Sequence, residues 1–302
     1  MPKVKAWLKA ARLRTLPLSV SGIIVGTALA GLYGASSTVL FILALCTTIG
    51  FQITSNFAND YGDGVKGTDN EERLGPQRTL QGGLLSRTEL KRGILISSII
   101  NLMLVLAVVY YAFGAQQLWY LLLFLVLGVV SIWAAIKYTV GTSAYGYKGF
   151  GDIFVFLFFG LLGVLGSMFL YTKSLTLWAV APAITVGLLS TAVLNLNNLR
   201  DCASDKNAGK NTLIVRLGFV NGKRYHYLLL LLSFLSALAF TWGHFDGWRS
   251  AIHLLAFVPI FIHFKKVRTT DEPVKLDPEL KKVALSTFLW ALLFYFAFNN
   301  FL

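Results

Sequence analysis

Asparagine and aspartate recur at helical spacing in two polar stretches that each follow a long apolar run. Within each stretch these residues stand three or four positions apart, and residues at that spacing share one face of a helix. They are Asn56, Asp60 and Asp63 in the first stretch, and Asn197, Asp201 and Asp205 in the second. Each stretch therefore predicts a row of oxygen ligands along the end of a helix.

Five carboxylates would converge if the two stretches meet, because Asp69 follows the first row. Such a group repels itself and is costly to desolvate unless it is neutralised. Carboxylate and amide oxygens suit Mg²⁺, with Mn²⁺ as a substitute, and Mg²⁺ keeps positions free for phosphate oxygens. Neighbouring basic residues are candidates for phosphate contacts; they are Lys66, Arg78, Lys137, Lys148 and Lys210. This combination beside apolar helices predicts a site for a diphosphate with an apolar tail.

The alternative interpretation is that these acids are solvated loop charges. A single aspartate after a helix would favour that interpretation, whereas two rows on the same predicted side of a membrane favour a site. The histidines are spread over three regions without ligand spacing, so we expect no metal there. The run from Lys265 to Lys282 is typical of a solvated connector.

The amino-acid composition indicates which kind of secondary structure positions these residues. Apolar residues make up 56% of the 302 residues and charged residues 14%, with a mean hydropathy of +0.65. A soluble domain carries roughly twice as much charge. Windows long enough to cross a bilayer (about 20 residues) occur at 15–33, 39–59, 93–113, 117–136, 152–171, 176–198, 225–243, 249–265 and 283–302. Since backbone groups inside a bilayer must be satisfied internally, we expect an all-α bundle of about nine transmembrane helices, forming one domain over residues 1–302.

The distribution of basic residues predicts how this bundle is oriented. If the connections are assigned alternately to two sides, every Lys and Arg except Lys173 and Arg249 falls on the side of the N-terminus. By the positive-inside rule the N-terminus is cytoplasmic and the C-terminus is outside. The first helix could be mistaken for a signal peptide, but its basic segment and apolar run are both long, so we expect it to be retained. Two long polar loops, 60–92 and 199–224, then place the acidic site at the cytoplasmic side.

Four stretches of the chain resemble the UbiA superfamily of intramembrane prenyltransferases, and the resemblance extends from Arg12 to about Gly218. In the first loop the family pattern NDxxDxxxD is matched at Asn59, Asp60 and Asp63; Gly67 stands at its last position and Asp69 takes its place. The second pattern, DxxxD, is matched in full. The four stretches are Arg12 to Pro17; Asn56 to Asp69 with Gly75 to Arg78; Lys137 to Gly141 with Tyr145 to Asp152; and Asn197 to Asp205 with Gly209 to Leu213.

The resemblance implies transfer of a polyprenyl group from its diphosphate to an aromatic acceptor. The likeness is greatest to the branch that prenylates 1,4-dihydroxy-2-naphthoate, with loss of CO₂ and diphosphate, to give demethylmenaquinone. It implies a multi-pass protein of the inner (cytoplasmic) cell membrane, with no nucleic-acid partner. The implied Mg²⁺ ligands are Asp60, Asp63, Asp69, Asp201 and Asp205. The implied substrate-binding residues are Asn56, Lys66, Arg78, Lys137, Tyr138, Asn197, Asn198 and Lys210. The implied catalytic residues are Tyr145, for cation stabilisation, Asp152, for acceptor deprotonation, and Lys148.

Two other functions stay open from the sequence. One is a prenyltransferase for a different acceptor, such as 4-hydroxybenzoate, homogentisate, or a haem or chlorophyll precursor; the Asn197-Asn198 pair favours naphthoate. The other is a membrane carrier of cations or polyprenyl lipids. Transport sites tend to lie near the membrane midplane on broken helices, whereas these acids lie at one face.

Overall fold

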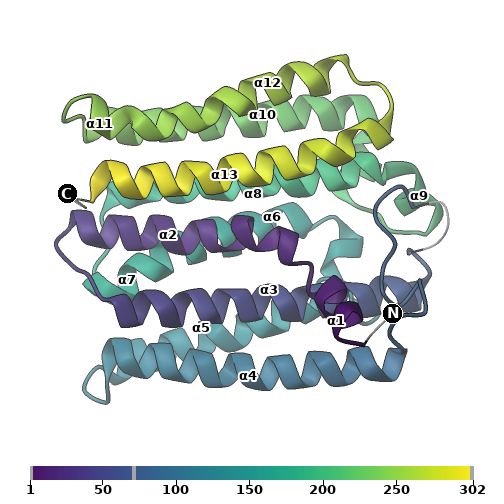
Figure 1. Cartoon of the computed structure of the whole chain (residues 1–302), viewed down its shortest axis with the longest axis horizontal. Coiled ribbons are helices and arrows are strands. Elements are labelled where there is room, and N and C mark those ends of the chain that lie inside the picture. Colours follow the sequence, from purple (N-terminus) through teal and green to yellow (C-terminus); the bar gives the residue numbers. More distant parts are fainter. Residues whose placement is uncertain (1–2, 70–72, 300–302) are drawn as a thin grey trace.

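The computed structural model describes residues 3–69 and 73–299, and in these ranges the chain is helical, with short connections. Nine stretches of the described residues are long and apolar enough to cross a membrane. Figure 1 shows these helices side by side along one direction, with α1 (Lys3–Ala11) and the end of α13 (Asp277–Phe298) at opposite ends of the bundle. The prediction of an all-α membrane bundle is confirmed.

Each predicted window corresponds to one observed span. The remaining long helices are α2 (Leu16–Leu32), α3 (Thr38–Lys66), α4 (Arg87–Phe113), α5 (Leu118–Lys137), α8 (Val180–Arg200), α10 (Leu213–Gly243) and α12 (Phe257–Thr269). Shorter pieces are α6 (Gly151–Val155), the π-helical η3 (Phe156–Gly166), α7 (Ser167–Thr172), α9 (Cys202–Asn207) and α11 (Trp248–Ala251), with the 3₁₀ turns η1 (Leu13–Thr15), η2 (Tyr145–Lys148), η4 (Leu177–Ala179), η5 (Ile252–Ala256) and η6 (Pro273–Leu276). The last three residues of the predicted window 283–302 lie outside the described residues.

The two predicted loops are shorter than the sequence suggested, because helices continue into them. α3 continues to Lys66 and α4 begins at Arg87, so the predicted loop 60–92 is wrong at both ends. Ser86 and Glu89 form a capping box that starts α4, with Ser86 N–H donating to Glu89 Oε2 over 2.8 Å. α10 begins at Leu213, which shortens the loop predicted at 199–224. Hydropathy does not detect these turns because they are polar.

Three clusters of buried apolar side chains hold the bundle together. Buried side chains of α2, α8, α10 and α13 make the largest, in which Trp290, Phe240 and Phe294 have no exposed surface. A second cluster joins α4 to α2, α3 and α7, and a third joins α1 to α3 and α4. Within the largest cluster η3 approaches α8 closely: a Cβ on Gly160 would lie 2.6 Å from the Cα of Gly187. Only glycine permits this contact, which holds η3 against α8.

The connector predicted between Lys265 and Lys282 carries mostly exposed charged residues, but it is largely helical and one of its acids is packed inside. α12 continues to Thr269, and α13 begins at Asp277 after η6, with Glu279 buried. A polar chain joins three helices at this point: His226 Nε2 lies 2.8 Å from His263 Nε2, and His263 Nδ1 lies 2.6 Å from Glu279 Oε2. Histidines that look scattered in the sequence therefore act together, tying α10, α12 and α13.

The polar contacts among His226, His263 and Glu279 lead to a prediction about the free energy of unfolding. Glu279→Gln keeps the size of the side chain but removes the anion that faces His263 and Lys282, whose Nζ lies 2.7 Å from Glu279 Oε1. Loss of a buried hydrogen bond to a charged group costs about 1.5–3 kcal/mol, so we expect the free energy of unfolding in detergent to fall by that amount. Glu272→Gln is the control, because its partner Lys275 is exposed and such pairs contribute about 0–1 kcal/mol. Equal unfolding midpoints for the two variants would contradict this prediction.

Candidate active site

The first acidic row lies at the end of α3, where Asp60 and Asp63 occupy the last two turns. Gly67 ends this helix with φ of +75°, a left-handed conformation that glycine adopts without strain. The turn brings Asp69 back, so that its N–H donates to the backbone oxygen of Asp63. All three carboxylates are at most 7% exposed, which argues against the alternative interpretation that they are solvated loop charges.

The second acidic row is interrupted by a break between two helices. α8 ends at Arg200 and α9 begins at Cys202, so the predicted single helical face is wrong at Asp201. Asp201 and Asp205 nevertheless remain one helical turn apart, because Asp205 N–H donates to the backbone oxygen of Asp201 over 2.8 Å. Both carboxylates are 3% exposed. Figure 1 shows α9 at the same end of the bundle as α1 and the end of α3.

Arginines join the two rows directly. Arg73 Nε lies 3.1 Å from Asp69 Oδ1, and its Nη2 lies 3.6 Å from Asp201 Oδ2. Arg78 lies 3.7 Å from Asp69 and 3.8 Å from Asp60. The meeting of the two stretches that the sequence predicts is therefore present in the structure.

Asp60 has further partners that the sequence did not indicate as part of the site. Arg12, which precedes the first transmembrane helix, forms an ion pair with Asp60. Thr79 donates to Asp60 Oδ2 from its hydroxyl over 2.7 Å and from its backbone N–H over 3.2 Å. The sequence could have indicated Arg12 as a site residue, because it begins the first of the four stretches that carry the family resemblance.

Arg200 holds the other end of the second row. Its guanidinium donates to both carboxylate oxygens of Asp201, over 2.8 Å and 2.6 Å, and contacts Asp277 at 2.5 Å. It also donates to Asn197 Oδ1 over 2.9 Å. The oxygen of Asn197 is thus engaged by Arg200, whereas Asn198 Oδ1 is buried without a hydrogen-bond partner.

Lysine and tyrosine side chains complete the polar cluster. Lys210 Nζ lies 3.6 Å from Asp205 Oδ1. The Tyr147 hydroxyl donates to Asp63 Oδ1 over 2.7 Å, and Lys66 Nζ lies 3.7 Å above the Tyr147 ring. Tyr147 belongs to a stretch that carries the family resemblance, but the sequence did not indicate a role for it.

The electrostatic environment differs among these groups. Burial raises the pKa of Asp69 to about 6 and that of Asp205 to about 6. Burial also acts to raise the pKa of Asp201, but the hydrogen bonds and charge of Arg200 outweigh it and leave that pKa lowered. For Lys210 burial favours the neutral amine, yet Asp63 and Asp205 overcome this and raise its pKa. Asp69 Oδ2 and Asp205 Oδ2 are buried without hydrogen-bond partners, so two carboxylate oxygens are available for another ligand.

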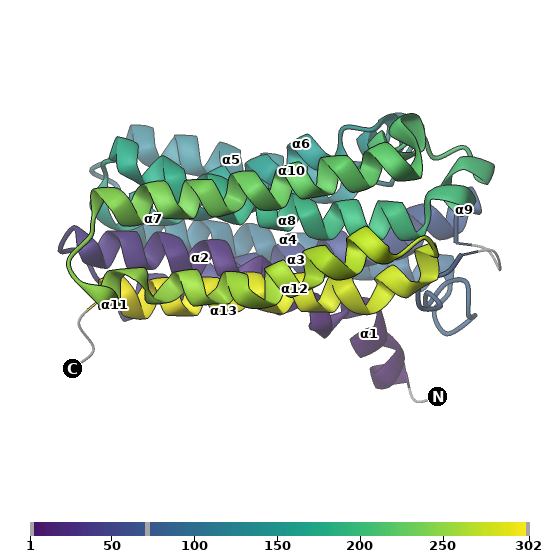
Figure 2. The same ribbon diagram turned by 90° about the horizontal axis from the view of Figure 1, so that it is seen from above.

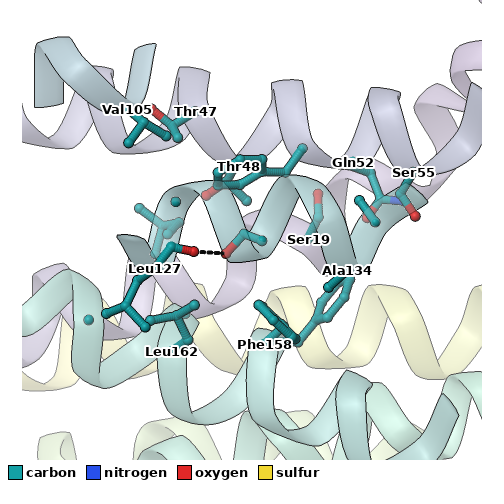
Figure 3. A pocket seen from close by; sticks show the side chains of 18 of the residues that line it. Ser19, Thr47, Thr48, Gln52, Ser55, Val105, Leu127, Ala134, Phe158 and Leu162 are labelled. Atoms are coloured by element: carbon teal, nitrogen blue, oxygen red, sulfur yellow. Dashed lines mark hydrogen bonds between the residues drawn. The ribbon is translucent and has the colours of Figure 1, made fainter. Parts of the chain in front are cut away.

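An apolar cavity of about 340 Å³ lies between α3, α4, α5 and η3. Figure 3 shows Thr48, Gln52, Leu127, Phe158 and Leu162 around this space. The lining includes Asn59, which precedes Asp60 in the chain, and two tyrosines of the α5–α6 connection, Tyr138 and Tyr145, whereas the five aspartates are not among its residues. Burial raises the pKa of Tyr138, and Asp63 and Asp205 lie close enough for their charges to raise this pKa further.

Among the other proposed site residues, Tyr138 and Tyr145 line this cavity, whereas Asp152 and Lys137 do not. Tyr138 packs edge-on against Tyr145, whose hydroxyl donates to the backbone oxygen of Ala134 over 2.9 Å, and burial raises the pKa of Tyr138 to about 12. Asp152 is buried and accepts a hydrogen bond from Tyr225. Lys137 is half-buried at the end of α5.

Two of the proposed residues have contacts that point away from the cluster. The side chain of Lys148 is exposed, and its backbone oxygen accepts a hydrogen bond from Arg216. Asn56 donates to the backbone oxygen of Ala11 over 2.9 Å, so it joins α3 to α1.

A nine-span helical bundle with a buried acidic and basic cluster beside an apolar cavity defines an intramembrane site for an amphiphilic anion. The sequence profile of the UbiA prenyltransferase family matches residues 19–292, and the chain belongs to this family. A 1,4-dihydroxy-2-naphthoate octaprenyltransferase of Escherichia coli is 44% identical over 97% of this chain and 94% of its own length. The Mycobacterium tuberculosis protein of the same name is 34% identical over 97% of this chain and 96% of its own.

Solved structures show the same fold. A UbiA homolog from Archaeoglobus fulgidus, determined with DMAPP and Mg²⁺ bound, superposes with a TM-score of 0.70 at 15% identity, covering 98% of this chain and 99% of that one. A digeranylgeranylglyceryl phosphate synthase superposes with a TM-score of 0.61 at 19% identity, covering 99% of each chain. The recognition of the family from the sequence is therefore confirmed.

Proposed function

We propose that the protein transfers a polyprenyl group from a polyprenyl diphosphate to 1,4-dihydroxy-2-naphthoate, releasing diphosphate and CO₂. The observation that carries the proposal is the buried acidic and basic cluster at the polar end of an apolar cavity. The relative that is 44% identical is named for this acceptor and for an octaprenyl donor. One domain, spanning residues 1–302, carries the reaction.

The donor set fits a divalent cation of the Mg²⁺ type. Its atoms are carboxylate and amide oxygens, the ligands that Mg²⁺ and Mn²⁺ prefer, and Asp69 Oδ2 and Asp205 Oδ2 are buried without partners. Among the residues that the structure describes, no three acidic, His or Cys side chains are gathered as a ready ligand set. Arg12, Arg73 and Arg78 occupy positions beside the carboxylates instead.

The five aspartates of the cluster are proposed to hold the cation. Four basic residues are proposed to contact the diphosphate. Bound there, the cation stabilises the negative charge that develops on the leaving diphosphate. Arginines that now neutralise the carboxylates turn to the phosphate oxygens, which they bind by planar two-point hydrogen bonds. The proposed cation ligands are Asp60, Asp63, Asp69, Asp201 and Asp205, and the proposed diphosphate contacts are Lys66, Arg78, Lys137 and Lys210.

The carbon skeleton reacts at the junction of cluster and cavity. The allylic C–O bond breaks, its electron pair leaves with the diphosphate, and the electron-rich naphthoate ring forms the new C–C bond. The ring then loses its carboxylate as CO₂, which leaves a prenylated dihydroxynaphthalene, the reduced form of demethylmenaquinone. Tyr138 and Tyr145 present aromatic rings at this junction, where a developing cation is stabilised, and the apolar lining excludes water that would intercept it. Asn197, Asn198 and Asp152 are proposed to contact or deprotonate the acceptor, and the exposed position of Lys148 does not support the role that the resemblance implied for it.

The choice of acceptor can be tested with purified protein. We expect prenylation of 1,4-dihydroxy-2-naphthoate with release of one CO₂ per product, measured by product mass and by ¹⁴CO₂ from carboxyl-labelled substrate. 4-Hydroxybenzoate should react poorly in the same assay. If prenylated 4-hydroxybenzoate were the main product, the naphthoate assignment would be wrong but the prenyltransferase activity would stand. Movement of intact polyprenyl diphosphate across vesicles without a product would instead support a carrier.

The proposed orientation places the acidic cluster on the cytoplasmic side of the inner cell membrane. A reporter fused after Leu302 is expected to be active only outside the cytoplasm, and one inserted at Asp271, between α12 and α13, only inside it. The expectation follows from the basic residues at the end of the bundle that holds α9. A reversed pattern at either position would overturn the orientation while leaving the helical arrangement intact.

A further inference from the structure

The first helix packs against the ends of α3 and α4 at an angle to the transmembrane helices (Figure 2). Arg12 has φ of +50°, a left-handed conformation, and η1 separates α1 from α2. Figure 2 shows that α1 projects sideways at the end of the bundle, at an angle to the long helices. With nine residues, α1 is too short to cross a bilayer by itself, which takes about 20 residues.

Three different stripes run along α1. Ala6, Ala10 and Ala11 are buried against the bundle. Val4 and Leu8, one turn apart, are 70% and 50% exposed. The third stripe consists of the exposed Lys5 and Lys9, also one turn apart. Since each residue turns a helix by about 100°, the lysine stripe lies directly beside the exposed apolar stripe.

Contacts at both ends fix the direction in which these stripes point. Lys3 Nζ lies 2.6 Å from Glu89 Oε1 at the start of α4. At the other end, Asn56 donates to the backbone oxygen of Ala11. Between them the Trp7 ring packs edge-on against Phe57, with centroids 5.1 Å apart. α1 is therefore held rigidly, with its apolar and basic stripes outward.

α1 packs against α4, whose outer surface is also apolar. Trp7 packs over Gly93 of α4, where an added Cβ would lie 2.6 Å from the ring. One turn further along α4, Leu95 and Ile96 are 62% and 58% exposed, on a helix whose exposed side chains face lipid. The two exposed apolar residues of α1, Val4 and Leu8, form too small a surface for a protein partner. A stable protein–protein interface needs roughly 800 Å² on each side.

We propose that α1 is an interfacial helix that binds anionic lipid headgroups through Lys5 and Lys9, with Val4 and Leu8 inserted at the acyl boundary. A basic stripe beside an apolar stripe is the arrangement by which such helices recognise anionic membranes. Each lysine near an anionic membrane surface strengthens binding to that surface by about fivefold. The binding site is a lipid site outside the catalytic cluster.

A fluorophore at position 8 tests this proposal in the full chain. Leu8→Cys, in a background of Cys46→Ala and Cys202→Ala, carries a bimane label, and the protein is reconstituted in equal mixtures of phosphatidylglycerol and phosphatidylcholine. One set of vesicles contains brominated phosphatidylglycerol and the other contains brominated phosphatidylcholine, so the ratio of quenching reports the lipid around α1. We expect phosphatidylglycerol to quench at least about fivefold more, and high salt to remove the preference.

Two variants separate the lysine stripe from general charge. Lys5→Gln/Lys9→Gln is expected to bring the quenching ratio close to one. Lys265→Gln/Lys281→Gln removes the same charge from exposed positions on α12 and α13 and should leave the ratio high. Equal quenching by both lipids in the parent, an unchanged ratio in the Lys5/Lys9 variant, or absence of quenching by either lipid would each overturn the proposal.

Discussion

Chelation of divalent cations is expected to abolish prenyl transfer, and added Mg²⁺ or Mn²⁺ is expected to restore it. The reason is that the leaving diphosphate must be stabilised in a cluster whose carboxylates are buried and close to one another. Removal of a single electrostatic contact to a developing charge costs about 10²–10³ in rate, and the cation makes several such contacts. We therefore expect a loss of at least about 10³-fold, measured as the initial rate of prenylated product in EDTA-treated protein.

A second measurement separates metal binding from turnover. Mg²⁺ together with inorganic diphosphate should raise the thermal unfolding midpoint, because a ligand that binds only the folded state stabilises it. Ca²⁺ is an informative comparison, since its larger radius and more flexible coordination place phosphate oxygens differently. Full turnover in metal-free buffer would show that the basic residues alone stabilise the leaving group.

The helical spans could be predicted because the information is local. A bilayer requires about 20 apolar residues per helix, and each of the nine windows satisfies this requirement within the chain. The end of α3 and the starts of α4 and α10 could not be located in this way, because these terminal turns are polar. Their continuation depends on capping, such as the contacts of Ser86 with Glu89, and on packing with neighbouring helices.

The acidic rows could be predicted for a different reason. The spacing of Asn56, Asp60 and Asp63 identifies a helical face without knowledge of the fold. The partners of these acids could not be predicted from the sequence. Arg73 reaches Asp201 across the cluster, over a sequence distance that no local pattern reveals. Thr79 meets Asp60 only because the loop folds back over α3.

Burial is the feature of the site that the sequence described wrongly. A row of acids at a helix end is typical of a solvated surface, where substitution of a carboxylate has little cost in stability. Asp60, Asp201 and Asp205 are instead at most 3% exposed, and the first two are paired with arginines. Removal of one member of a buried ion pair costs about 3–5 kcal/mol, so stability must be measured alongside activity.

Asp205→Asn is the substitution that best separates ligation from folding. Asp205 has Lys210 as its ion-pair partner at 3.6 Å, and its Oδ2 is buried without a hydrogen-bond partner. The amide keeps the size and polarity of the side chain but removes the anion, so one hard oxygen ligand of the proposed cation is lost. We expect the rate at saturating Mg²⁺ to fall by at least about 10²–10³-fold, with a higher Mg²⁺ concentration needed for half-maximal rate.

Asp201→Asn should lose activity by a similar factor but also lose stability, because Arg200 then faces a neutral group. Asp60→Asn and Asp63→Asn extend the comparison to the first row. The matched control is Asp271→Asn, whose carboxylate is 96% exposed and lies 3.5 Å from Lys223, outside the cluster. Initial rates are compared between detergent-purified variants after correction for the folded fraction. If Asp205→Asn retained the rate and the Mg²⁺ dependence of the Asp271→Asn control, the second acidic row would not ligate the metal. The proposed catalytic site would then be limited to the end of α3, with Lys210 and the arginines as the remaining contacts for diphosphate.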